Sequence, residues 1–221
     1  MPIQYSLTII LLSFVFLLIS IFASRLNYKK RFNMKYSLLN YFPYELNYES
    51  KFVDNFLGNF AFGFASLTSL FFYATFNTSH SNGFSFVIMI AGIFASVMIF
   101  VNLFIPLKYL KLHIFTSTFT SIMNILLAAG TVALNVDEFK ISNKPINLIA
   151  AIIAGLIALY LLVLILNPNY SLRIKGVEKK EENGQVTYVR PKLILMAFAE
   201  WNMMFVPFAT AIPLMMYLII I

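Results

Sequence analysis

Glu200 is the side chain that could do the most chemistry, because it lies inside a long apolar segment, residues 193–221. If that segment is a membrane helix, a rise of about 1.5 Å per residue places Glu200 on the order of 10 Å inside the membrane. An unpaired carboxylate at that depth costs roughly 2–4 kcal/mol or more. We therefore expect Glu200 to face a partner, water or a ligand, with His113, Asn55 and Asn202 as candidates to orient it.

Other polar residues lie at membrane depth in the same way. The further candidates for a substrate site or pathway are Asp54, Asn59, Asn124 and Asn102. Within residues 108–135, polar and small side chains recur in steps of three and four: His113, Ser117, Thr120, Asn124, Ala128, Thr131 and Asn135. Residues 53–76 and the residue that follows them carry a matching stripe: Asn55, Asn59, Gly63, Ser66, Tyr73 and Asn77. Such stripes either pack helices closely or line a polar cavity, and the amides and His113 favour the cavity more than the hydroxyl residues do.

Metal binding and catalysis receive little support from the sequence. His113, Asp54 and Glu200 are residue types that hold divalent ions, but no spacing fixes them together. The absence of cysteine excludes disulfides, thiolate metal sites and a catalytic thiol. There is no phosphate-binding loop and no nucleophile set beside a base. We therefore predict no catalytic residue, no metal and no cofactor, and an enzyme is the less favoured alternative.

Two prolines interrupt the segment that contains Glu200. Pro207 and Pro213 each remove a backbone donor and free the carbonyl one turn earlier, at Met203 and at Ala209. Transporters use such broken helices to present carbonyls to a cavity. The alternative is a kink that only shapes the bundle.

The elements that must position these residues are membrane helices. The chain has 221 residues, 60% of them hydrophobic and 11% charged, with a mean hydropathy of +0.82. A membrane core about 30 Å thick needs roughly 20 apolar residues per helix. We predict an all-α integral membrane protein, a single domain over residues 1–221 with a six-helix transmembrane bundle. The predicted spans are residues 5–24, 53–76, 84–106, 108–135, 146–166 and 193–221.

The positive charges predict the orientation of this bundle. Most of the sixteen Lys and Arg residues lie in the first, third and fifth connections between spans. This alternation predicts a cytoplasmic location for those connections and an outside location for both ends of the chain. The net charge of +7 is then explained by topology and by anionic lipid headgroups, so the predicted partners are the lipid bilayer and other membrane subunits, and no nucleic acid.

Composition also bears on the source membrane. Abundant Phe, Ile, Asn, Lys and Tyr with few Arg indicates an AT-rich coding genome. We expect the cell membrane of a low-GC bacterium, with an organelle inner membrane as the alternative.

Two cytoplasmic connections have patterns of their own. In residues 28–42, Tyr28, Phe32, Tyr36 and Leu39 recur at helical spacing, which predicts a short amphipathic helix at the headgroups or, alternatively, a docking helix for a partner protein. Residues 172–190 predict a small cytoplasmic β-hairpin with an Asn-Gly turn. Its expected arms and charged tip are Leu172, Ile174 and Val177, then residues 178–182, then Val186 and Tyr188.

Three functions fit these patterns. The leading hypothesis is a transport-type protein or transporter subunit, with a cytoplasm-facing polar cavity between the second, fourth and sixth spans. The second is a non-catalytic accessory or assembly subunit of a membrane complex. The third is a lipid-modifying membrane enzyme, in which an Asp/His/Glu cluster would do acid–base work.

Overall fold

Six long helices dominate the computed structural model, which describes residues 3–47, 51–76, 83–167, 178–182 and 185–218. The helices are α1 (Ile3–Phe32), α2 (Phe56–Phe76), α3 (Gly83–Val101), α4 (Leu110–Ser142), α5 (Pro145–Leu166) and α6 (Leu195–Leu218). Three short 3-10 helices are η1 (Pro43–Asn47), η2 (Phe52–Asn55) and η3 (Leu107–Tyr109). Each of the six long helices is long and apolar enough to cross a membrane. The chain is therefore a multi-pass membrane protein, as the hydropathy pattern predicts.

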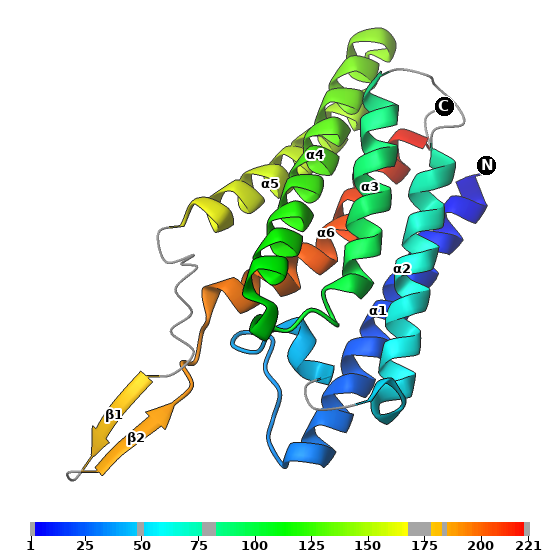
Figure 1. Ribbon diagram of the computed structural model, residues 1–221. Helices are drawn as coiled ribbons and strands as arrows, with labels where there is room; N and C mark the ends of the chain where they lie inside the picture. Colours follow the sequence, from blue (N-terminus) through cyan, green and yellow to red (C-terminus); the bar gives the residue numbers. More distant parts are fainter. Residues whose placement is uncertain (1–2, 48–50, 77–82, 168–177, 183–184, 219–221) are drawn as a thin grey trace.

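The helices form one bundle in which α6 is the inner member (Figure 1). Each of α1 to α5 packs against its neighbour in the chain, and α6 packs against α1, α3, α4 and α5. The buried share of the apolar stretch is 67% in α6 and 28% in α5, so α6 is enclosed and α5 is peripheral. Functional side chains on α6 consequently face other helices rather than lipid.

Small residues set the close approach of α2 and α3. A Cβ atom at Gly92 would lie 2.2 Å from the Tyr73 ring, so only glycine admits that ring. One turn later, the Ser66 hydroxyl donates to the Ser96 carbonyl oxygen at 2.7 Å. These contacts belong to helix packing, the role that small and hydroxyl residues play in membranes.

The predicted interfacial helix over residues 28–42 is wrong. The first span continues as one helix to Phe32 and ends at Asn33, which adopts a left-handed φ of 52°. The chain then turns back, and the Tyr36 ring packs on the Tyr28 ring with centroids 5.2 Å apart. Tyr28 and Tyr36 are 6% and 2% exposed, because these aromatic side chains pack against one another in the protein core instead of in lipid headgroups.

The predicted β-hairpin over residues 172–190 is also wrong, because its first strand lies at other residues than expected. Residues expected at its charged tip form strand β1 (Glu178–Glu182), which pairs antiparallel with β2 (Gln185–Val189). The expected first arm up to Val177 and the Asn183-Gly184 turn lie outside the described residues. This two-stranded ribbon projects away from the helices (Figure 1), so the membrane domain itself is all-helical.

Candidate functional site

Buried polar side chains gather in two places at one end of the bundle, where α1 ends and α2, α4 and α6 begin (Figure 1). The first place lies between α1 and α2. Asn55, 2% exposed, donates to the Ser24 hydroxyl at 2.9 Å and to the Asn47 side-chain oxygen at 3.1 Å. Asn59 donates to the Phe52 carbonyl oxygen at 3.1 Å. These are neutral amides that satisfy one another and the nearby backbone.

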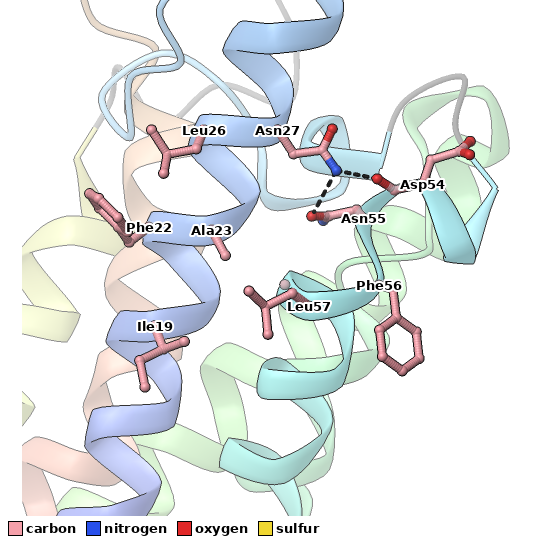
Figure 2. Close-up of a pocket in the computed structure, with 10 residues that line it drawn as sticks. Ile19, Phe22, Ala23, Leu26, Asn27, Asp54, Asn55, Phe56 and Leu57 are labelled. Atoms are coloured by element: carbon pink, nitrogen blue, oxygen red, sulfur yellow. Dashed lines mark hydrogen bonds between the residues drawn. The ribbon is translucent and has the colours of Figure 1, made fainter.

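A groove of about 420 Å³ runs beside this amide cluster. Its walls are apolar side chains of α1 and the start of α2, and its polar rim is formed by Asn27, Asp54 and Asn55 (Figure 2). Asn27 donates to the Asp54 carbonyl oxygen and to the Asn55 side-chain oxygen, the latter at 3.4 Å. The Asp54 carboxylate instead accepts the Lys51 backbone N–H at 2.7 Å and so caps η2. Asp54 therefore has a local structural role.

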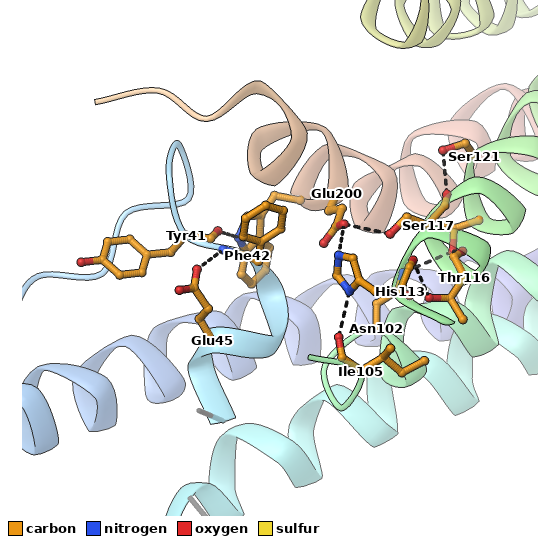
Figure 3. A network of polar contacts seen from close by, with 12 residues as sticks. Tyr41, Phe42, Glu45, Asn102, Ile105, His113, Thr116, Ser117, Ser121 and Glu200 are labelled. Carbon is orange, nitrogen blue, oxygen red and sulfur yellow. Dashed lines mark hydrogen bonds and ion pairs between the residues drawn. The ribbon is translucent and has the colours of Figure 1, made fainter. Parts of the chain in front are cut away.

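The second place lies between α4 and α6 and contains the His113–Glu200 pair (Figure 3). The His113 Nε2 atom lies 2.8 Å from Glu200 Oε1, and the two side chains are 2% and 3% exposed. His113 belongs to the first turn of α4 and Glu200 to the second turn of α6, so the pair joins the beginnings of two spans. It is a buried contact between two ionisable groups, which in a membrane protein makes the pair a candidate functional site.

Each member of the pair has one further hydrogen-bond partner in the protein. His113 Nδ1 contacts the Ile105 carbonyl oxygen at 2.8 Å, in the connection between α3 and α4. The Ser117 hydroxyl, one turn along α4 from His113, donates to Glu200 Oε1 at 2.8 Å. The second carboxylate oxygen, Oε2, and His113 Nε2 are both buried and have no hydrogen-bond partner among the described residues, so the pair is held as an ion-pair contact.

Aromatic rings cover the pair on its outer side. The rings of Phe42 and Tyr44 both meet His113 edge-on, with centroids 5.8 and 5.7 Å away. Phe42 immediately precedes η1 and Tyr44 lies within it, so residues 39–47 form a lid over the site. A low-dielectric cover strengthens the electrostatic interaction beneath it.

The lid is fastened to the segment that leads into α6. Arg190 makes two hydrogen bonds to the Glu45 carboxylate, at 2.7 and 3.2 Å. The Arg190 guanidinium also lies 4.1 Å from the centre of the Tyr41 ring. Trp201 Nε1 donates to the Tyr41 carbonyl oxygen at 2.9 Å, and the Ile194 N–H donates to the lid backbone at the same distance. Opening the lid must therefore break contacts with the start of α6.

Two titratable groups beside the lid, Tyr36 and Arg190, have pKa values shifted by their surroundings. Burial raises the pKa of Tyr36 well above its ordinary value, and the charge of Glu45 raises it further. Burial by itself lowers the pKa of Arg190, but the hydrogen bonds and charge of Glu45 outweigh that effect and leave the pKa raised. Near neutral pH, Tyr36 is accordingly neutral and Arg190 is charged.

Asn124 supplies a hydrogen bond that Pro207 removes from α6. Its amide donates to the Met203 carbonyl oxygen at 3.1 Å, the carbonyl that Pro207 leaves without its helical donor. From α2, the Tyr73 hydroxyl donates to the Pro207 carbonyl oxygen and lies 3.1 Å from the Thr210 hydroxyl. The stretch of α6 around Pro207 is thus held by side chains from two other helices.

The remaining candidates bond other partners than the pair. Asn202 accepts from the Tyr160 hydroxyl of α5 at 2.9 Å, and Asn102 donates to the Thr120 hydroxyl at 3.2 Å. No group of three or more His, Cys, Asp or Glu suited to a metal ion occurs among the described residues. The structure therefore brings His113 and Glu200 together and distributes the other candidates among packing, capping and the kink.

Sequence reasoning missed the lid and its fastening. Phe42 and Tyr44 looked like membrane-interface aromatics, and Glu45 and Arg190, separated by most of the chain, gave no sign of a relationship. Ser117 was noted only as one position of a stripe. Its spacing of four from His113 is the one signal that could have placed it beside the same partner.

Comparisons with models of protein families, with curated proteins and with solved structures found no match for this chain. Its function is therefore inferred from the geometry of its own residues.

Proposed function

We propose that this chain is a small transport-type membrane protein, or one subunit of a transporter, and that the His113–Glu200 pair is its charge-bearing site. The observation that carries the proposal is the 2.8 Å contact between two ionisable side chains buried where two spans begin. A pair of this kind is expensive to bury and adds little stability over apolar residues of similar volume. Ion and substrate pathways are where membrane proteins keep such residues.

The prolines of α6 near the pair support a mechanism in which α6 bends. Pro207 and Pro213 interrupt α6 beyond Glu200, and Asn124 replaces one missing backbone donor. A helix with side-chain-supported kinks has fewer internal hydrogen bonds to break when it bends. The site lies between α4 and α6, and α2 supports the kink through Tyr73 rather than lining the pair. The proposed pathway therefore lies between α4 and α6 alone, and not in a cavity shared by the second, fourth and sixth spans.

The orientation is part of the proposal. The basic connections would lie in the cytoplasm, so the lid and the pair would face that side, and both ends of the chain would lie outside, in the cell membrane of a low-GC bacterium. Because the sequence has no cysteine, single cysteines at Lys29 and Lys179 can be labelled cleanly. Both should react with a membrane-impermeant maleimide only from the cytoplasmic side. Reaction from opposite sides would overturn this orientation.

Transport is tested by currents from proteoliposomes on a solid-supported membrane. Rapid exchange into Na⁺, K⁺, tetraethylammonium, glutamate or phosphate should evoke a saturable current with at least one probe. Glu200→Gln should abolish that current while keeping the helix content and gel-filtration profile of the unmodified protein. Asp54→Asn is the matched control, because it removes an exposed carboxylate at the same end of the bundle and should leave the current intact. Currents that persist unchanged in Glu200→Gln, or no current with any probe, would contradict the proposal.

A further inference from the structure

The contacts of His113 determine where its protons are. Its Nδ1 atom lies 2.8 Å from the Ile105 carbonyl oxygen, and a carbonyl oxygen can only accept a hydrogen bond. Nδ1 must therefore carry a hydrogen. The protonation of the ring is then decided at Nε2, the nitrogen that faces Glu200.

The Nε2 contact requires one more proton. A neutral imidazole with its hydrogen on Nδ1 has only a lone pair at Nε2, and an ionised carboxylate has only lone pairs at Oε1. These two atoms would repel one another at the observed 2.8 Å. A hydrogen on Nε2 is not aligned for a hydrogen bond to the carboxylate. The contact is therefore attractive only when the pair carries one further proton, either as an imidazolium–carboxylate ion pair or as imidazole with carboxylic acid. Both forms contain the same number of protons, and both are neutral overall.

The neighbouring groups leave this proton to the pair. Ser117 contributes a neutral hydroxyl, and Asn102 in the nearby connection is occupied with Thr120. The titratable groups on the lid side are Tyr44, whose ring packs on His113, Tyr36, and the Glu45–Arg190 ion pair. Glu45 and Arg190 neutralise one another. The lid therefore brings no net charge to the site.

We propose that the His113–Glu200 pair binds a single exchangeable proton and that this proton holds the α4–α6 contact and the lid closed. This inference rests on the proposed function and makes the proton the coupled ion. When the proton leaves for water, a neutral imidazole and a carboxylate remain, with a net charge of −1. The repelling lone pairs then separate the starts of α4 and α6. A buried charge of −1 needs compensation, so the species that replaces the proton is a cation.

Closure and proton binding are mechanically connected through α6. Trp201 follows Glu200 in the chain and donates to the Tyr41 carbonyl oxygen of the lid. A displacement of Glu200 away from His113 therefore pulls on the lid contact of the next residue. Trp201 is the one tryptophan in the sequence and is 1% exposed, so its fluorescence reports this contact directly.

The experiment is a fluorescence titration of the full-length protein in lipid nanodiscs between pH 5 and pH 9. As pH rises, Trp201 emission should move to longer wavelength and acrylamide quenching should increase, following a curve for one proton. The double variant His113→Gln/Glu200→Gln retains an amide–amide hydrogen bond across the same interface without a titratable group. It should remain closed over the whole range, whereas Asp54→Asn should titrate like the unmodified protein.

Several results would overturn the proposal. They are a flat titration of the unmodified protein, a slope corresponding to two protons, or a transition that survives in the double variant. Gel filtration and helix content by circular dichroism establish that each variant is folded, and Ser117→Ala provides a milder second variant that should displace the midpoint without removing the transition. The titration needs no transported substrate. Transport currents without a pH transition would refute proton binding by the pair and leave the proposed transport function standing. A pH transition without transport currents would refute the transport function and leave proton binding by the pair standing.

Discussion

The two polar regions at the same end of the bundle stabilise their buried polar side chains in different ways. Between α1 and α2, Asn55, Asn59 and Ser24 form a neutral cluster of amides and a hydroxyl. Between α4 and α6, His113 and Glu200 form a titratable pair under a cover of aromatic rings. The amide cluster is structural because its hydrogen bonds do not depend on protonation. The pair is titratable, and we propose that its interface has two states that differ by one proton.

This difference gives the two regions different sensitivities. Amide hydrogen bonds contribute about 1 kcal/mol each and are nearly independent of pH. A buried acid–base pair is costly to break on one side and nearly neutral to replace on both sides. Mutations that remove one partner or replace both partners therefore test the comparison directly.

The largest effect is expected for Glu200→Ala. It leaves His113 buried opposite a cavity, which should lower the free energy of unfolding by about 3–5 kcal/mol. Replacing both partners with apolar residues, His113→Phe with Glu200→Met, should restore most of that loss. Asn55→Ala in the other region should cost about 1–3 kcal/mol. Unfolding in mixed micelles, followed by circular dichroism, measures all three. Equal losses for Glu200→Ala and the double variant would erase the distinction between the regions.

A middle-sized effect is expected for Gly58→Ala in the amide region. The added Cβ would lie 2.0 Å from the Ser24 hydroxyl oxygen and 2.6 Å from the Asn55 side-chain oxygen. Because both neighbours are buried, overpacking should cost about 1–3 kcal/mol. Gly155→Ala is the control, since its Cβ meets only an ordinary contact at 3.9 Å. The same unfolding measurement should show no loss for Gly155→Ala, and tolerance of Gly58→Ala would mean that the amide region is not rigid.

The smallest effect is expected for Arg190→Gln, which removes the ion pair that fastens the lid. Arg190 and Glu45 are 30% and 13% exposed, so solvent screening limits the loss to about 1 kcal/mol. The change should be clearer in local opening than in global stability, as greater acrylamide quenching of Trp201. Adding salt should reproduce part of this effect in the unmodified protein. Quenching that is identical in Arg190→Gln and in the unmodified protein would show that the aromatic contacts alone hold the lid.

The spans were the most predictable part of the fold. Long uninterrupted apolar segments such as residues 146–166 leave a helix as the only way to satisfy the backbone inside lipid. The connections were predictable only in part. The periodicity of Tyr28, Phe32 and Tyr36 indicated an amphipathic helix, but the helix ends at Asn33 and the rings pack on one another. A local pattern cannot distinguish an aromatic residue that faces lipid from one that faces another part of the chain.

The sequence alone determined that this protein is a multi-pass membrane protein and that Glu200 would be costly to bury, because hydrophobic length and charge are local properties. Only the tertiary structure decided that Glu200 meets His113, that Asn124 bonds the Met203 carbonyl oxygen, and that Phe42 and Tyr44 cover the pair. These contacts join positions far apart in the chain, and their geometry depends on how α6 is enclosed by the other helices. Spacing along one helix fixes a face, but only packing fixes what that face meets.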